Sequence, residues 1–130
     1  MILKSYKIHE TLEFCEEEFR MKISELCKEA HTNASDKGFW EDIFDIKFLR
    51  LDEMHWNNAI AARLALIHTE VSEATEALRK DDFENFKEEL ADIVIRVADL
   101  AGGLNIDLEH EIEKKVKKNK LREYKHGKQF

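Results

Sequence analysis

Apolar residues recur every three or four positions along most of the chain, which is the pattern of amphipathic α-helices. The first stripe predicts a helix over residues 9–31, with apolar positions at Leu12, Cys15, Phe19, Ile23, Leu26 and Ala30. The most regular stripe predicts a helix over residues 56–79, with a seam at Ile60, Leu64, Ile67, Val71, Ala74 and Leu78. The next runs from Phe83 through Phe86, Leu90, Ile93, Val97 and Leu100. A last, weaker stripe predicts a helix over 108–122, at Leu108, Ile112 and Val116.

Breaks between these stripes are short. Residues 33–38 have the composition of a loop, and Gly38 is the expected break. Residues 39–51 are apolar at irregular spacing and are expected to be partly helical. Residues 80–82 form a tight connection that ends in a candidate N-cap, Asp82, and a pair of glycines at 102–103 stops the following helix. We therefore expect an all-α fold, an antiparallel four-helix-type bundle with an extra N-terminal helix and loop region.

Composition agrees with a helical chain. The 130 residues suit a single domain over 1–130, and there are no prolines and only four glycines to interrupt helices. Charged residues make up 38% of the chain, which fits long solvated helix faces. Cys15 and Cys27 fall twelve residues apart on the first predicted helix, too far apart to bridge, so we expect buried packing thiols.

Charge is divided unevenly along the chain. Residues 114–130 hold eight Lys/Arg and one Glu, a charge of +7. Because the net charge of the whole chain is −7, residues 1–113 carry −14. An acidic body is a poor surface for duplex nucleic acid. No apolar run approaches the 18 residues of a membrane span, and the opening residues do not form a signal peptide. We expect a cytoplasmic protein without a membrane partner.

Two pairs of acids lie at matching positions in neighbouring predicted helices. Glu70 and Glu73 each precede a seam residue, and Glu89 and Asp92 do so in the next helix. If the chain turns near 80–82, the four carboxylates are level. They would repel one another unless a cation neutralised them, and oxygen-only ligands suit Mg²⁺ or Mn²⁺. The alternative is that these acids are solvated residues at the edges of two surface helices.

The same residues carry a resemblance to a known family. The segment from Leu66 to Ala74 (LIHTEVSEA) and the segment from Glu88 to Arg96 (EELADIVIR) are similar to the motifs of MazG-like all-α nucleoside triphosphate pyrophosphohydrolases. The similarity extends from Asn33 to residues 115–128 and includes Gly103–Asp107. Thr69 stands where the family motif has its first Glu.

The resemblance implies a reaction and a set of roles. The implied substrate is a nucleoside or deoxynucleoside triphosphate, which would be cleaved to the monophosphate and pyrophosphate, in nucleotide pool control or house-cleaning. The metal ligands implied by the resemblance are Glu70, Glu73, Glu89 and Asp92. Glu76 is a candidate for an additional ligand because it lies one helical turn beyond Glu73. Because the hydroxyl of Thr69 cannot replace a carboxylate as a base, we expect either Glu73 or Asp92 to take the proton from the attacking water. The basic face implied to reach the triphosphate is formed by Lys115, Asn119 and Arg122, at i, i+4 and i+7.

Several alternatives remain open from the sequence. Trp40 and Trp56 either stack a nucleobase or pack in the core, and Asp99 is either a further metal or ribose contact or a solvated acid. A di-iron carboxylate bundle is disfavoured because it needs two Glu-x-x-His motifs inside the bundle, whereas the chain has one, at 123–126 in the basic tail. Its two Asp-x-x-His pairs, beginning at 52 and 107, fall at helix starts. Another hypothesis is a non-catalytic helical module that binds a nucleotide or a partner.

Self-association is the remaining expectation. Extra apolar residues around 39–49 exceed what one four-helix core covers. The family resemblance implies a homodimer or homotetramer in which helices of two chains enclose the site.

Overall fold

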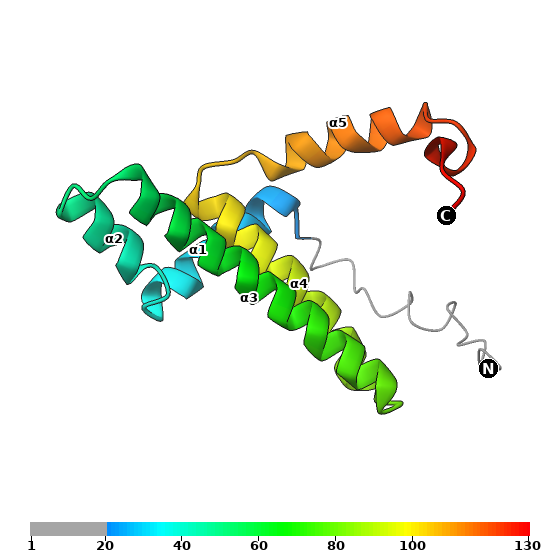
Figure 1. The fold of residues 1–130 in the computed structure, drawn as a ribbon, viewed down its shortest axis with the longest axis horizontal. Helices are drawn as coiled ribbons and strands as arrows, with labels where there is room; N and C mark the ends of the chain where they lie inside the picture. The colour runs from blue at the N-terminus through cyan, green and yellow to red at the C-terminus, as the bar shows by residue number, and fades with distance from the viewer. Residues whose placement is uncertain (1–20) are drawn as a thin grey trace.

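The computed structural model describes residues 21–130, and over that range every regular element is helical (Figure 1). The elements are α1 (Ile23–Asp36), α2 (Glu41–Phe48), α3 (Glu53–Arg79), α4 (Phe83–Gly103), α5 (Leu108–Lys120) and a short 3₁₀ helix, η1 (Tyr124–Gly127). The all-α helical bundle predicted from the apolar periodicity is confirmed.

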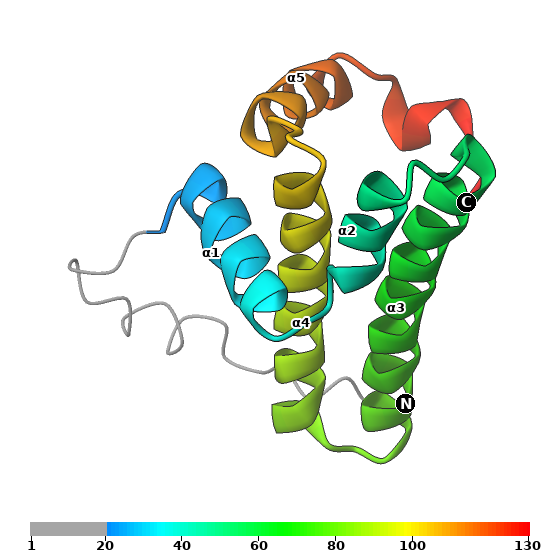
Figure 2. The same ribbon diagram turned by 90° about the vertical axis from the view of Figure 1, so that its left-hand side faces the viewer.

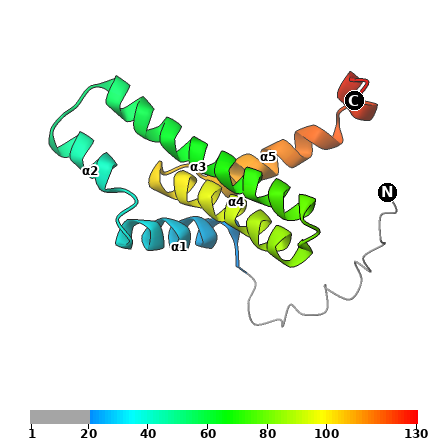
Figure 3. The ribbon, with the colours of Figure 1, turned by 60° about the horizontal axis from the view of Figure 1, so that its bottom comes forward.

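α4 is the central element of the bundle. It runs antiparallel to α3 after the turn at residues 80–82, and α1 packs along its other side (Figures 2 and 3). α2 packs against the N-terminal half of α3 and closes one end of the molecule. The long α3–α4 hairpin therefore carries the predicted acidic residues on two helices in direct contact.

Three aspartates begin helices by capping them. The side chain of Asp52 accepts a hydrogen bond from His55 N at 3.1 Å, and that of Asp107 accepts one from His110 N at 3.0 Å. Asp82 caps α4 in the same way, as predicted, through Asn85 N at 3.1 Å. The two Asp-x-x-His pairs are thus explained as helix caps, and they give no support to a di-iron site.

The first helix differs from the prediction. α1 continues through residues 33–36, where a loop was expected, and it ends at Asp36. Tertiary packing overrides the loop-forming composition, because Ala34 in this last turn packs against the cluster around Trp40. Gly38 is the break, with φ of 87°. The predicted apolar positions at 12, 15 and 19 lie outside the described residues.

Small residues form most of the core. One cluster joins α1 to α4, through Cys27, Ala30, Ala98 and Ala101, and a second joins the α2 region to α3, through Trp40, Ile43 and Ala59. Cys27 is a free, buried thiol whose pKa is raised by burial, as expected of a packing cysteine. The other cysteine, Cys15, lies outside the described residues.

The face of α3 that is buried in the bundle differs from the predicted seam. Ala74 is buried as expected, but Leu64, Val71 and Leu78 are 49%, 44% and 62% exposed. The face that meets the bundle instead holds Ala59, Arg63, Glu70, Ala74 and Ala77. Alanines let α4 approach closely, and the larger apolar residues are left to one side as a stripe repeating every seven residues. Leu90 on α4 is also exposed, at 46%.

α5 leaves the bundle. It crosses the end of α4 remote from the α3–α4 turn and then runs outward (Figures 1 and 2). Its first turn is held by Leu108, which packs against the α1–α4 cluster. Across residues 21–130, no helix has both the length and the apolar character to cross a membrane.

Candidate functional site

Three of the predicted metal ligands converge across the α3–α4 hairpin. Carboxylate oxygens of Glu70, Glu73 and Glu89 all lie within 4.8 Å of one another. Glu70 and Glu89 are only 6% and 8% exposed, whereas Glu73 is exposed. The i,i+3 spacing on α3 and the short turn before α4 produce this convergence, as the helical rise predicts.

Glu89 has the environment of a metal ligand. Its Oε2 is buried and has no hydrogen-bond partner among residues 21–130. Burial raises the pKa of Glu89, and the nearby charges of Glu73, Glu70 and Asp92 raise it further. A buried acceptor in a cluster of acids is stabilised by a cation. An all-oxygen donor set fits a hard divalent ion such as Mg²⁺ or Mn²⁺.

One guanidinium already touches this cluster. Arg96 Nε on α4 donates a hydrogen bond to Oε1 of Glu70 on α3. The Arg96 side chain is 36% exposed and that of Glu70 is 8% exposed, so the pair lies at the mouth of the cluster. Arg96 was not singled out from the sequence, although its position one helical turn after Asp92 places both on one face of α4.

Asp92 lies beside the cluster and not inside it. It is exposed and forms part of the wall of a cavity that also includes Glu70. Thr69, at the position of the missing family Glu, donates its hydroxyl to Ala65 O at 3.1 Å along its own helix. Glu76 is paired with Lys80 at 3.4 Å and is not in the convergent group.

A cavity of about 270 Å³ adjoins the carboxylates. Its wall includes Glu70, Asp92 and Arg96 beside the acidic cluster, Asp99 farther along α4, and Asn33 on α1. Apolar side chains form most of the remaining wall, the larger ones being Phe39, Leu66 and Ile95, and the buried Arg63 also lines it. A concave apolar space with polar groups in its wall is typical of a small-molecule site.

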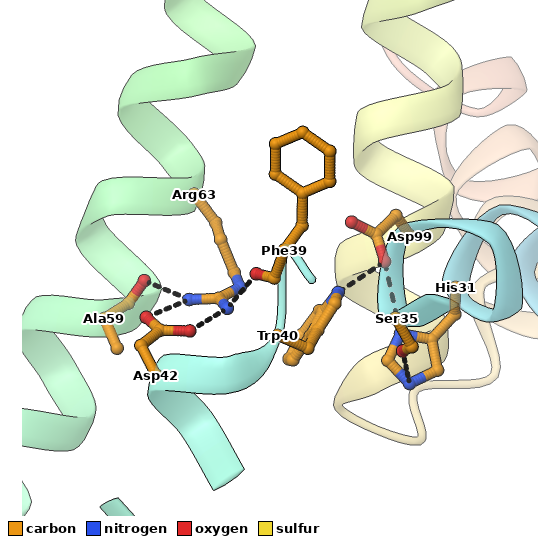
Figure 4. A network of polar contacts seen from close by, with 8 residues as sticks. All are labelled: His31, Ser35, Phe39, Trp40, Asp42, Ala59, Arg63 and Asp99. Carbon is orange, nitrogen blue, oxygen red and sulfur yellow. Dashed lines mark hydrogen bonds and ion pairs between the residues drawn. The ribbon is translucent and has the colours of Figure 1, made fainter. Parts of the chain in front are cut away.

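A polar network holds the linker between α1 and α2 against this cavity (Figure 4). Arg63 is buried and donates from Nη1 to Asp42 Oδ2 at 3.0 Å and to Ala59 O at 2.8 Å. Its Nη2 donates to Asp42 Oδ1 at 2.6 Å and to Phe39 O at 2.9 Å. The hydrogen bonds from Arg63 to Asp42 lower the pKa of the Asp42 carboxyl group. Arg63 was missed from the sequence; its position two helical turns before Glu70 was the available signal.

The two tryptophans lie in packing environments. Trp40 is 8% exposed, with the Arg63 guanidinium 4.1 Å from its ring centroid and the His31 ring against it at 4.7 Å. Trp56 is half-buried beside the same cluster, with Lys47 Nζ 5.6 Å from its ring. Base stacking on either ring remains a prediction.

The predicted triphosphate-binding residues lie on α5 and directly after it, away from the bundle. Lys115 and Asn119 are on α5 and Arg122 follows it, and all three are exposed. None of them belongs to the wall of the cavity beside Glu70 and Asp92. A single chain therefore does not bring this basic face to the carboxylates.

Comparison with known proteins gives a family for the second half of the chain. A family model described as MazG-like family matches residues 65–130. The matched segment contains all four predicted metal ligands and the basic residues of α5. No curated protein and no solved structure matches the chain.

Proposed function

The chain belongs to the MazG-like family, and on that premise we propose that it is a divalent-metal-dependent pyrophosphohydrolase of nucleoside or deoxynucleoside triphosphates. The family indicates a nucleotide pyrophosphohydrolase-type function. The proposed reaction breaks the bond between the α- and β-phosphates and releases the monophosphate and pyrophosphate. The observation that carries the proposal is the partly buried carboxylate cluster beside a cavity of about 270 Å³.

The acids of the hairpin are proposed to hold Mg²⁺, or Mn²⁺ in its place. Glu70, Glu73 and Glu89 would supply the convergent oxygens, with Asp92 beside them on α4. When bound, the ion supplies charge neutralisation for the phosphates and acidifies a water molecule. The Oε2 atom of Glu89, which has no hydrogen-bond partner within residues 21–130, supports this assignment.

Glu73 and Asp92 are proposed to take the proton from the attacking water. Both are exposed, in contrast to the buried Glu70 and Glu89, so both are accessible from the solvent side of the cluster. The two buried acids are better suited to binding, because their positions are fixed by the packing of α3 on α4. Thr69 is not needed for this division of roles.

A second copy of the chain is proposed to complete the site. The exposed stripe of Leu64, Val71 and Leu78 has the seven-residue repeat of a helix–helix seam. The basic segment carries +7 and the rest of the chain −14, so a partner's basic face complements the acidic hairpin. Lys115, Asn119 and Arg122 would then contact the triphosphate bound to the other chain.

The test is pyrophosphate release from the common and modified triphosphates, with Mg²⁺ and with excess chelator. We expect release that requires the ion and that is abolished in Glu70→Gln and in Asp92→Asn, with the helical circular dichroism signal retained. Glu88→Gln is the matched control, because Glu88 is an exposed acid adjoining Glu89 that lies outside the convergent group. Binding of a nucleoside triphosphate without release of pyrophosphate would instead favour a non-catalytic binding module.

A further inference from the structure

Three residues of α4 line the cavity. Asp92, Arg96 and Asp99 are spaced i, i+4 and i+7, so they share one face of the helix. At 1.5 Å per residue, Asp99 lies roughly 10 Å along the axis from Asp92. With phosphates at the carboxylate cluster, that span places Asp99 at the level of the far edge of a nucleotide's base.

Asp99 is held in one orientation by two donors. Its Oδ1 accepts hydrogen bonds from Trp40 Nε1 at 2.8 Å and from His31 Nδ1 at 3.1 Å. Because an ionised carboxylate can only accept, His31 must carry its proton on Nδ1. The Asp99 side chain is 19% exposed. The carboxylate is thus preorganised and has little freedom to rotate.

The other oxygen of Asp99 is available to a ligand. Oδ2 has no hydrogen-bond partner within the described part of the chain, and Figure 4 shows it pointing away from both donors. Asp99 belongs to the cavity wall, which also includes the exposed ring of Phe39 and the side chains of Leu66 and Ile95. Apolar walls around a fixed acceptor suit a flat ring that carries an N–H donor at its edge.

We propose that the cavity is a nucleobase subsite in which Asp99 accepts a hydrogen bond from an exocyclic amino group. Cytosine and adenine offer such a group, whereas their deaminated counterparts, uracil and hypoxanthine, offer a carbonyl oxygen at the same position. A carbonyl oxygen facing a fixed carboxylate leaves both acceptors unpaired and repelling each other. The inference rests on the proposed function and adds a base preference to it.

The other polar groups of the cavity do not make this distinction. Glu70 and Asp92 belong to the proposed metal site, and the terminal nitrogens of Arg63 donate to Asp42, Ala59 O and Phe39 O. The Asn33 amide both donates and accepts, so it pairs with either kind of base edge. Arg96 only donates, which suits a carbonyl that cytosine and uracil share. Asp99 is therefore the specificity-determining residue. A preference for amino bases favours a role in nucleotide pool control over removal of deaminated nucleotides.

The experiment compares two substrate pairs that differ by deamination, dCTP with dUTP and dATP with dITP. We expect kcat/KM to favour the amino member of each pair by about tenfold or more. In Asp99→Asn the amide oxygen still accepts from Trp40 and His31, while the cavity-facing atom becomes a donor. That variant should lower the amino preference by about tenfold or more, or invert it. Asp45→Asn, an exposed acid of α2 outside the cavity wall, is the control that leaves the ratio unchanged.

Binding separates failure of this inference from failure of the proposed function. Calorimetry with dCMP and dUMP measures the base preference without any turnover. If no triphosphate releases pyrophosphate but dCMP still binds more tightly, the subsite stands and the reaction fails. Equal kcat/KM and equal binding within each pair of the wild-type protein would overturn the subsite, whether or not Asp99→Asn folds. An unchanged ratio in a folded Asp99→Asn protein would overturn the role of Asp99.

Discussion

The guanidinium of Arg96 on α4 hydrogen-bonds the buried carboxylate of Glu70 on α3, at the edge of the acidic cluster. The positive charge of Arg96 offsets part of the repulsion among Glu70, Glu73 and Glu89. It also joins the two helices of the hairpin at the level where their acids meet. Among residues 21–130, Arg96 is therefore the cation that is bonded to this cluster.

Replacing Arg96 with Gln should destabilise the metal-free protein by about 1–3 kcal/mol, because it leaves Glu70 buried and without its charged partner. The deficit should shrink in saturating Mg²⁺, which compensates the same carboxylates. Urea unfolding with chelator and with Mg²⁺ measures both values. Arg79→Gln, which alters an exposed arginine on the same helix as Glu70, should have little effect in either condition. An equal loss with and without Mg²⁺ would show that Arg96 does not compensate the cluster.

Glu89→Gln should have opposite effects in the two conditions. It removes the buried carboxylate whose Oε2 has no partner in the described chain, so the metal-free protein should become more stable. It also removes a ligand, so the gain in melting temperature on adding Mg²⁺ should fall. In the wild-type protein that gain corresponds to about 2.7 kcal/mol at an ion concentration one hundred times Kd. Glu88→Gln should keep the wild-type response; a flat wild-type melting temperature across millimolar Mg²⁺ would contradict the metal site.

Gly103 is required by the position of Trp40. A Cβ at residue 103 would overlap the outer ring atoms of the tryptophan. Gly103→Ala should cost about 1–3 kcal/mol of the free energy of unfolding, because neither group has room to move. Trp40→Phe removes those outer atoms, so the double variant should lose less than the sum of the two single variants. Strict additivity in denaturant unfolding would show that the two residues do not clash.

The helices could be predicted from the sequence, because periodicity and caps are local properties. The regular stripe over 56–79 corresponds to α3, and Asp82 caps α4 as expected. The face that α3 presents to α4 could not be predicted in the same way. Ranking positions by apolar size favours Leu64 and Val71, which are exposed, whereas the packing of α3 buries the smaller Ala59 and Ala77, which lie outside the predicted seam.

The residues of the site also fall into those that local spacing predicts and those that only tertiary contacts reveal. Glu70, Glu73 and Glu89 could be brought together by spacing and helical rise alone. Arg63 and Arg96 could not be assigned, because a charged residue on a helix is usually solvated, and their partners come from other helices. The network around Asp99 joins α1 to α4 over 68 residues of sequence, and no local pattern reports such a contact.

Acid should weaken the contact between Asp42 and Arg63. The hydrogen bond from Arg63 lowers the pKa of Asp42 below its ordinary value of 3.8. The ionised form therefore contributes stability above pH 3.8, and that contribution is lost as the pH falls through the lowered pKa. The stability difference between the wild-type protein and Asp42→Asn should be greatest near neutral pH and should shrink below pH 3.8. In Asp45→Asn, an exposed neighbour on α2, the difference from wild type should show no such collapse; a constant difference for Asp42→Asn would mean that the pair does not form.

Self-association should raise the molecular mass measured in solution above that of one chain. The stripe of Leu64, Val71 and Leu78 exposes apolar surface that a second copy would cover, so light scattering at micromolar concentration should report a dimer or tetramer. Leu64→Asp places a charge in the stripe and should shift the mass toward the monomer. Ala62→Asp, at an exposed position of α3 outside the heptad positions, should not.

Mixing two inactive variants tests whether the basic segment of one chain serves the acids of the other. Asp92→Asn removes a carboxylate and Arg122→Ala removes a cation, and in a mixed dimer one of the two sites retains both groups. Activity should therefore return, to about a quarter of the wild-type value if the chains mix at random and each intact site works independently, because half of the dimers are mixed and each has one intact site. The exposure of Arg122 and its absence from the cavity wall of its own chain motivate this expectation. A dimer whose mixed variants stay inactive would place both groups in one chain, and a fully active monomer would refute the assembly.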